Sequence, residues 1–141
     1  LGTCDTTGLA DPEYQCPPGE SYVDLTGFKP AAVHDLSANA NIVYSFNLGG
    51  SLDGFARLEY VYEEDVNLAD LIPASIATRG FKNVNASVGF SADDWSLMFW
   101  GRNMTDHETL YSAFPTTASP GSFSGYPSAP STYGVTFKMN L

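Results

Sequence analysis

Side chains that could bind a metal or act as catalysts are few and scattered in this sequence of 141 residues. The acidic run Glu63-Glu64-Asp65, with Asp70 nearby, offers the carboxylate oxygens that Ca²⁺ prefers. Its spacing matches no calcium-binding loop, so a solvated acidic loop is the simpler interpretation. His34 and His107 fall in separate expected loops, and we interpret them as surface residues rather than a metal or proton-transfer pair. The sequence therefore predicts no metal site and no cofactor.

Cys4 and Cys16 lie in a polar segment that contains proline and glycine. Two cysteines without histidine partners make a poor metal site, and no neighbouring residue indicates thiol catalysis. A disulfide within a loop is the first interpretation, and two free thiols are the alternative. A disulfide implies an oxidising compartment.

Composition narrows the fold and the function. Sixteen acidic residues against six Lys and Arg residues argue against binding the phosphates of nucleic acid. The sequence has no Gly-x-Ser-x-Gly element, Walker loop or paired metal ligands, so we do not expect an enzyme. Thirteen Gly, nine Pro, eight Tyr and nine Phe residues are typical of strands joined by turns. We therefore expect an all-β fold.

The elements that position the side chains follow from the alternation of apolar and polar residues, which is the period of a β-strand. Five such stretches are expected, at residues 34–46, 52–63, 81–92, 95–104 and 132–141. In the last stretch one face carries Tyr133, Val135, Phe137, Met139 and Leu141. In the fourth, Met98 and Trp100 make the second face the least polar of the set. The expected arrangement is an antiparallel up-and-down meander.

The connections between these stretches alternate between short and long. Residues 47–51 and 92–94 form short turns, whereas residues 64–80 and 105–131 form long loops. A membrane β-barrel has short turns on one side and long loops on the other, and a soluble meander has no reason for this alternation. No run reaches the roughly 20 apolar residues of a membrane helix, so any span would consist of strands. The N-terminus lacks a signal sequence, so we expect a signal that has been removed or a chain that is a piece of a longer protein.

Aromatic residues on the apolar face give an independent indication of a membrane. Tyr and Trp prefer the two water interfaces of a bilayer. The expected strands place Tyr44, Phe46, Phe90 and Trp95 near the short turns, and Tyr60, Tyr62 and Tyr133 near the long loops. A soluble β-sandwich would show the same alternation along its strands without these two bands.

The sequence from about residue 23 to residue 141 resembles the C-terminal end of TonB-dependent outer-membrane receptors. The resemblance lies in Asn83-Val84-Asn85-Ala86-Ser87-Val88-Gly89-Phe90, Trp95-Ser96-Leu97, Arg102-Asn103-Met104-Thr105-Asp106 and Tyr133-Gly134-Val135-Thr136-Phe137. Met104 stands where the Asn-Leu-x-Asp element of the family has Leu, a change of similar volume. Leu141 is the final residue, whereas the family usually ends in Phe or Trp, so the last strand departs from the family's usual assembly signal.

The resemblance implies a plugged barrel of roughly 22 strands in the outer membrane of a Gram-negative bacterium, of which this chain supplies about five. Residues 1–33 would form an extracellular loop with the disulfide, and residues 34–141 the C-terminal strands. The implied partners are outer-membrane lipid, the rest of the barrel and its plug domain, the barrel-assembly machinery, and a TonB-type energy-transducing protein reached through upstream residues. Four charged residues, Arg57, Glu59, Glu63 and Arg102, would point into the lumen and pair with one another or with the plug.

The loop from Ser112 to Ser131 is rich in Gly, Pro and Ser and would lie outside the cell. Its aromatic residues, together with the preceding one, are Tyr111, Phe114, Phe123 and Tyr126. Exposed aromatics on such a loop are suited to stacking on a sugar or an aromatic siderophore. Alternatively, they pack the loop against the rim of the barrel.

We therefore expect an active-transport receptor that imports a scarce, large solute such as a metal–siderophore complex, a vitamin or an oligosaccharide. A passive porin-like barrel shares all of these features except the resemblance at Asn103–Asp106. A secreted soluble β-sandwich that binds carbohydrate is the third hypothesis. It differs in predicting that the apolar faces of the strands meet across a closed core.

Overall fold

The structure is a computed structural model that describes residues 2–6, 8, 12–69, 72–119 and 121–140. The chain divides into two compact units. The first comprises Leu1–Asp35, Glu64–Gly80 and Thr109–Ser128, and the second comprises Leu36–Glu63, Phe81–Glu108 and Ala129–Leu141. Within the described residues, no helix is long and apolar enough to cross a membrane.

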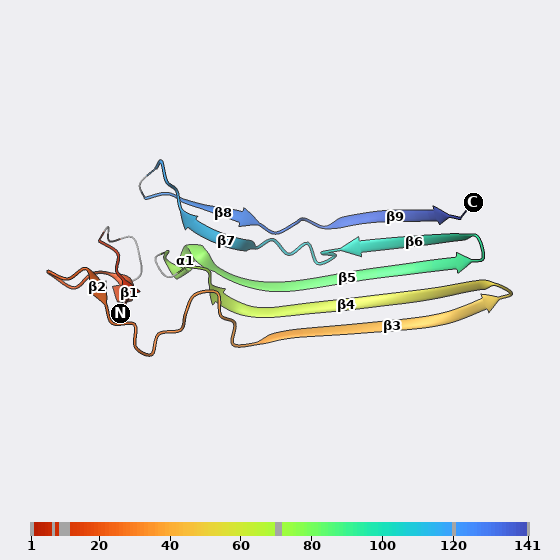
Figure 1. The fold of residues 1–141 in the computed structure, drawn as a ribbon, viewed down its shortest axis with the longest axis horizontal. Coiled ribbons are helices and arrows are strands. Elements are labelled where there is room, and N and C mark those ends of the chain that lie inside the picture. Colours follow the sequence, from red (N-terminus) through yellow and green to blue (C-terminus); the bar gives the residue numbers. More distant parts are fainter. Residues whose placement is uncertain (1, 7, 9–11, 70–71, 120, 141) are drawn as a thin grey trace. The chain divides into compact units, whose positions relative to one another are not determined.

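An antiparallel sheet of five strands is the largest element of the structure (Figure 1). Its strands are β3 (Ser37–Gly49), β4 (Leu52–Asn67), β5 (Thr78–Ala92), β6 (Trp95–Arg102) and β9 (Thr132–Met139), in that order across the sheet. The expected all-β fold and antiparallel up-and-down order are confirmed, with one hairpin inserted along the chain between β6 and β9. None of the three sheets closes on itself within the described residues.

The pairing register puts one set of apolar residues from all five strands on one face, while Val43, Phe55 and Val61 lie on the other. Ile42 lies opposite Leu58, Val88 opposite Phe99, and Leu97 opposite Phe137. Because side chains alternate along a strand, the residues between these positions lie on the other face. That face carries the pairs Asn41 with Glu59, Ser87 with Trp100, and Ser96 with Lys138. The predicted division into an apolar and a polar face is therefore confirmed.

Two predicted connections are wrong in part. β4 continues to Asn67 and β5 begins at Thr78, so the expected long loop at residues 64–80 consists partly of strand. A short helix, α1 (Ala74–Ala77), fills part of the interval. The physical reason is that this segment has apolar side chains to bury. Ile72 and Ala77 are 1% and 0% exposed and form a small core with Ala113 of the first unit.

The predicted loop at residues 105–131 is also wrong, because it contains a β-hairpin made of β7 (Leu110–Pro115) and β8 (Phe123–Pro127). Its Gly, Pro and Ser content indicated a loop, but the two prolines within the strands, Pro115 and Pro127, each stand at the last position of a strand, where a missing backbone N–H does little harm. Phe123 packs against the core of Ile72, Ala77 and Ala113, which anchors the hairpin.

The N-terminal part of the first unit contains the predicted disulfide, which joins Cys4 to Cys16. Two short strands, β1 (Gly2–Thr3) and β2 (Tyr22–Val23), pair here, and the 3-10 helix η1 spans Pro12–Tyr14. Asp24 accepts hydrogen bonds at Oδ1 from the hydroxyl and the amide of Thr26, at 2.6 and 2.9 Å. These bonds, the hydroxyl first, hold the pKa of the Asp24 carboxyl below its usual value.

Aromatic rings lie over glycines at several places in the sheet. Phe46 covers Gly54, its cross-strand partner on the apolar face, and Phe46 also meets Phe90 edge-on at 6.4 Å between ring centroids. On the polar face, the indole of Trp100 covers Gly134, its own cross-strand partner. A glycine gives the ring room to lie flat on the neighbouring backbone. These glycines therefore position the aromatic side chains.

We predict that Gly134→Ala lowers the free energy of unfolding by about 1–3 kcal/mol, because the added methyl group displaces the Trp100 ring. The measurement is a urea titration of the chain in detergent micelles. A Trp100→Ala background is the control, since the methyl group added at position 134 then meets no ring and should be neutral or stabilising. Equal losses in the two backgrounds would contradict the proposed role of this glycine.

Candidate functional site

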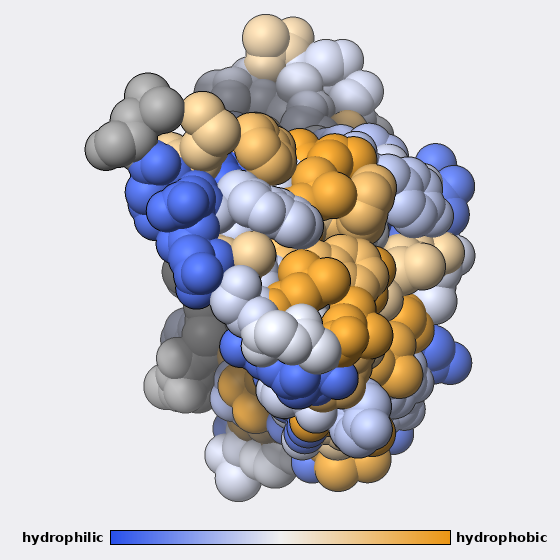
Figure 2. Space-filling model, turned by 90° about the vertical axis from the view of Figure 1, so that its right-hand side faces the viewer, coloured by the Kyte–Doolittle hydropathy of each residue, from blue (hydrophilic) through white to orange (hydrophobic). Residues whose placement is uncertain are grey.

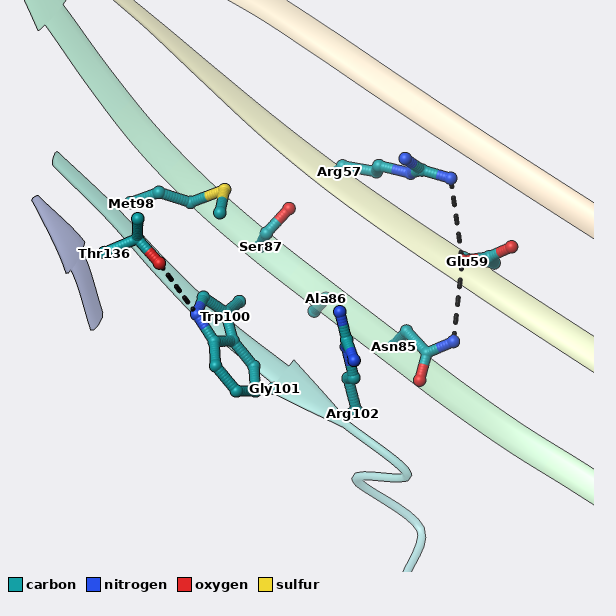
Figure 3. Close-up of a pocket in the computed structure, with 10 residues that line it drawn as sticks. All are labelled: Arg57, Glu59, Asn85, Ala86, Ser87, Met98, Trp100, Gly101, Arg102 and Thr136. Carbon is teal, nitrogen blue, oxygen red and sulfur yellow. Dashed lines mark hydrogen bonds and ion pairs between the residues drawn. The ribbon is translucent and has the colours of Figure 1, made fainter. Parts of the chain in front are cut away.

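A pocket of about 440 Å³ lies on the polar face of the five-stranded sheet (Figure 3). Four neighbouring strands contribute to it, which places residues far apart in the sequence next to one another. Its polar and aromatic lining consists of Arg57 and Glu59 from β4, Asn85 and Ser87 from β5, Trp100 and Arg102 from β6, and Thr136 from β9.

The side chain of Trp100 is held in position in this pocket by a hydrogen bond and by the packing of its ring. Its indole Nε1 donates a hydrogen bond to the Thr136 hydroxyl at 3.2 Å, while the ring rests on Gly134. The guanidinium of Arg102 lies over the ring, with Cζ at 5.2 Å from the ring centroid. A cation over an indole face is favoured by about 0.5–1 kcal/mol at exposed sites. The Trp100 ring therefore orients the exposed Arg102 side chain.

Arg57, Glu59 and Asn85 form a loose chain of contacts on the opposite side of the pocket (Figure 3). Arg57 Nη2 lies 3.6 Å from Glu59 Oε2, and Asn85 Nδ2 lies 3.5 Å from the same oxygen. Both distances are long compared with the usual 2.7–3.2 Å of a hydrogen bond. Arg57 is also 46% exposed, so this ion pair is well solvated and contributes little to stability.

Sequence reasoning placed Arg57, Glu59 and Arg102 on the polar face, and the pocket brings all three together. Glu63 lies on the same face opposite Ser37 and does not line the pocket. Sequence reasoning missed four of the lining residues, namely Asn85, Ser87, Trp100 and Thr136. Alternation along the predicted strands could have identified them, because Asn85 and Ser87 share one face of their strand, and Trp100 shares a face with Arg102.

Asn103 is buried, at 5% exposure, and has φ of 47°, in the left-handed region. It directly follows β6, which is why this strand ends at Arg102 rather than at the predicted Met104. Its side-chain amide donates to the carbonyl oxygens of His107 and Ala129, at 3.3 and 2.9 Å. Its Oδ1 accepts from the His107 amide at 3.1 Å. Asn103 thereby links the end of β6 to the segment that leads into β9.

The other residues of this turn bind the neighbouring strands. The backbone N–H of Asn103 donates to Asn85 Oδ1 at 3.1 Å, and the backbone N–H of Met104 donates to the Val84 carbonyl at 2.9 Å. These two bonds attach the turn to β5. Asp106 Oδ1 accepts from the Ser131 amide at 3.0 Å, just before β9 begins. The Asn-Met-Thr-Asp segment is therefore a structural junction, and it contacts the pocket through Asn85.

The four aromatic residues predicted to contact a ligand lie on the β7–β8 hairpin and behave differently from one another. Phe123 packs against the small core of the first unit. Phe114 and Tyr126 are 37% and 64% exposed, and their rings lie 5.6 Å apart between centroids. Tyr111 is 51% exposed and lies 6.0 Å from the Arg79 guanidinium. Three of the four rings are thus open to solvent, and one is structural.

The structure also locates the acidic run at residues 63–65 and the histidine His34. Glu63, Glu64 and Asp65 lie on β4 rather than in a loop, and alternation sends Glu64 to the face opposite the other two. Asp70 lies outside the described residues. His34 is half-buried rather than a plain surface residue, because its Nδ1 lies 2.9 Å from the Glu64 carbonyl and its Nε2 lies 3.3 Å from Arg79 Nη2. Among the described residues, no three His, Cys, Asp or Glu side chains group as metal ligands.

The last strand, β9, presents Tyr133, Val135, Phe137 and Met139 on the apolar face, each at least 57% exposed. Leu141, the fifth residue predicted for this stripe, lies outside the described residues.

Comparisons of the chain with models of protein families, with curated proteins and with solved structures give no match.

We predict that Asn103→Gly lowers the free energy of unfolding by roughly 2–4 kcal/mol, because it preserves the left-handed backbone but removes three hydrogen bonds between a buried side chain and the backbone of His107 and Ala129. Hydrogen exchange should also accelerate at the His107 amide, which loses its acceptor. Met104→Leu is the matched control at the next position, with an expected change below about 0.5 kcal/mol. An Asn103→Gly variant as stable as the control would contradict the junction role.

Proposed function

We propose that this chain forms C-terminal strands of a transmembrane β-barrel in the outer membrane of a Gram-negative bacterium, and that the barrel is an active-transport receptor of the TonB-dependent type. The observation that carries this proposal is the uncovered apolar face of the five-stranded sheet. Ile42, Val135 and Phe137 are 65%, 60% and 60% exposed, and the described residues of their own unit form no second sheet that could pack on them.

The extent of this face argues for a hydrocarbon environment. Soluble proteins rarely leave a large continuous apolar surface open to water, because burying it is favourable by about 25 cal/mol per Å². Figure 2 views the molecule from the end that carries the two short turns and shows apolar residues gathered in a band. Acyl chains of lipid would cover such a face along its whole length.

Two further features support a barrel wall. The turns joining β3 to β4 and β5 to β6 are two residues long, at Gly50-Ser51 and Asp93-Asp94, whereas the other two connections are long. Aromatic residues of the apolar face gather near both ends. Phe46 lies near the short turns, and Tyr62 pairs with Ala38 near the other end. The eight steps from residue 38 to residue 46 span about 26 Å at roughly 3.3 Å per residue, close to the height of about 25 Å of the apolar band of a barrel.

The edges of the sheet support a larger assembly. β3 and β9 lie at its two edges, and no strand in the described part of the chain pairs with their outer sides. Unpaired backbone groups in hydrocarbon cost several kcal/mol each. A barrel that supplies further strands satisfies them, and the disulfide between Cys4 and Cys16 fits the oxidising side of an outer membrane. The imported solute would be scarce and large, such as a metal–siderophore complex, a vitamin or an oligosaccharide.

Collision experiments with spin labels test the membrane contact. We predict that a label at Ile42→Cys, in the protein inserted in outer-membrane lipid, collides more often with O₂, which dissolves in lipid, than with a water-soluble nickel chelate. Asn41→Cys, one residue away on the polar face, is the matched control and should show the lower ratio of O₂ to nickel collisions. Few collisions with either reagent at position 42 would instead indicate a soluble sandwich core, and frequent nickel collisions a wet surface.

A passive porin-like barrel is the second candidate, because the exposed apolar face and the turn lengths fit it equally well. Conductance separates the two. We predict that the purified protein in planar bilayers shows no steady open channel, because a plug domain fills the lumen of a receptor of this type. A stable conductance of the unmodified protein would favour the porin and contradict active transport.

A further inference from the structure

The pocket on the polar face carries charge opposite to that of the chain as a whole. The sequence has a formal net charge of −10, yet the pocket is lined by two arginines and one glutamate. Two of the six Lys and Arg residues of the chain, Arg57 and Arg102, are therefore concentrated at one site. Positive side chains at a hollow in an acidic protein favour an anion there over the rest of the surface.

The donors of the pocket are available to a ligand. The guanidinium of Arg102 lies over the Trp100 ring, with Cζ at 5.2 Å from the ring centroid, and this contact uses none of its N–H groups as hydrogen-bond donors. Within the described residues, neither this guanidinium nor the Ser87 hydroxyl has a hydrogen-bond acceptor, and both line the hollow drawn in Figure 3. A guanidinium attracted to a neighbouring ring is partly oriented before a ligand arrives, so less side-chain entropy is lost on binding.

Glu59 offsets only part of the positive charge of this site, because one carboxylate lines the pocket together with two guanidinium groups. Its carboxylate is 25% exposed and lies 3.6 Å from Arg57 Nη2, in a contact too long for a hydrogen bond. Arginine pairs best with carboxylate or phosphate oxygens in a fork of two parallel hydrogen bonds, and this geometry is not made with Glu59. An oxyanion in the pocket can therefore bind Arg57 without displacing a strong partner, and Glu59 is left as an acceptor for hydroxyl groups.

We propose that the pocket binds an oxyanion, either a carboxylate or a phosphate group, carried by a small hydroxylated solute. Arg57 and Arg102 bind the anionic group, and Asn85, Ser87 and Glu59 offer hydrogen bonds to the hydroxyl groups. The volume of about 440 Å³ lies at the lower end of the range for small-molecule sites, roughly 300–1,000 Å³. This inference uses only side chains of the polar face, which in the proposed barrel would line the lumen.

The test is a titration of the full chain in nonionic detergent micelles, with the fluorescence of Trp100 as the signal. Trp95 lies on the apolar face, so a Trp95→Phe background leaves Trp100 as the single indole without altering the pocket. The probes are glucuronate, glucose 6-phosphate and glucose, which share a hexose body and differ in the anionic group. We expect a saturable signal with at least one of the anions and none with glucose. The tighter of the two anions identifies the group that the pocket prefers.

Substitutions then assign the binding to the pocket. Arg57→Gln and Arg102→Gln should each weaken binding by about tenfold or more, because each removes a charged donor fork. Lys138→Gln removes the same charge from the same face, opposite Ser96 and outside the pocket, and should leave the affinity unchanged. Equilibrium dialysis with radiolabelled probes gives a second reading if a substitution near the ring alters the fluorescence itself.

Three results would overturn the proposal. These are the absence of saturable binding of either anion, equal binding of glucose, and an equal loss in Lys138→Gln, which would mean that the general charge of the face attracts the probe. If Arg102→Gln fails to fold, Arg57→Gln still decides the matter, because Arg57 lies on β4, which β5 separates from the strand that carries Trp100. Spin-label collisions at positions 41 and 42 do not involve the pocket, so the membrane proposal and this one can fail separately.

Discussion

The register of the five strands is the constraint on which both surfaces of this protein depend. Because side chains alternate with a period of two, a slip of one residue between neighbouring strands would exchange the two faces of the slipped strand. The pairing that brings Ile42 opposite Leu58 on the apolar face also brings Asn41 opposite Glu59 on the polar face. The lipid-facing role proposed for one side and the anion pocket proposed for the other therefore share a single structural cause.

The register itself is held by a few specific interactions at the strand ends. At one end, Asn103 and Asp106 fasten the chain between β5 and β9, and at the other the Asn140 amide donates to the Asp94 carbonyl at 2.9 Å. Between them, Trp100 lies on Gly134 and reaches Thr136, so β6 and β9 fit in one alignment only. The apolar face of this sheet buries little surface within the described chain, so burial alone does not fix which residues pair. The hydrogen bonds and ring contacts between neighbouring strands fix the register instead.

The parts of the fold that depend on local pattern could be predicted from the sequence, and the parts that depend on distant pairing could not. The faces of the strands follow from alternation, and the two short turns from their Gly and Asp residues. The hairpin of Leu110–Pro115 and Phe123–Pro127 was missed because its composition is that of a loop and its anchor, the core around Ile72, is distant in sequence. The pocket was missed in part because Trp100 bonds Thr136 across 36 residues. The role of the junction was missed because Asn103 bonds Ala129 and Asp106 bonds Ser131, and both partners are distant in the sequence.

The inserted hairpin has a consequence for how the last strand reaches its place. β9 pairs with β6 at Arg102 and Thr132, a separation of 30 residues, whereas β5 meets β6 at Ala92 and Trp95, a separation of three. The tenfold longer loop costs about 2 kcal/mol more in closure entropy. However, the Ser128 amide donates to the Thr109 carbonyl at 2.7 Å, which closes the base of the hairpin. Once that contact has formed, the effective loop between β6 and β9 shortens to residues 103–108 and 129–131, so pairing of β9 with β6 costs less closure entropy.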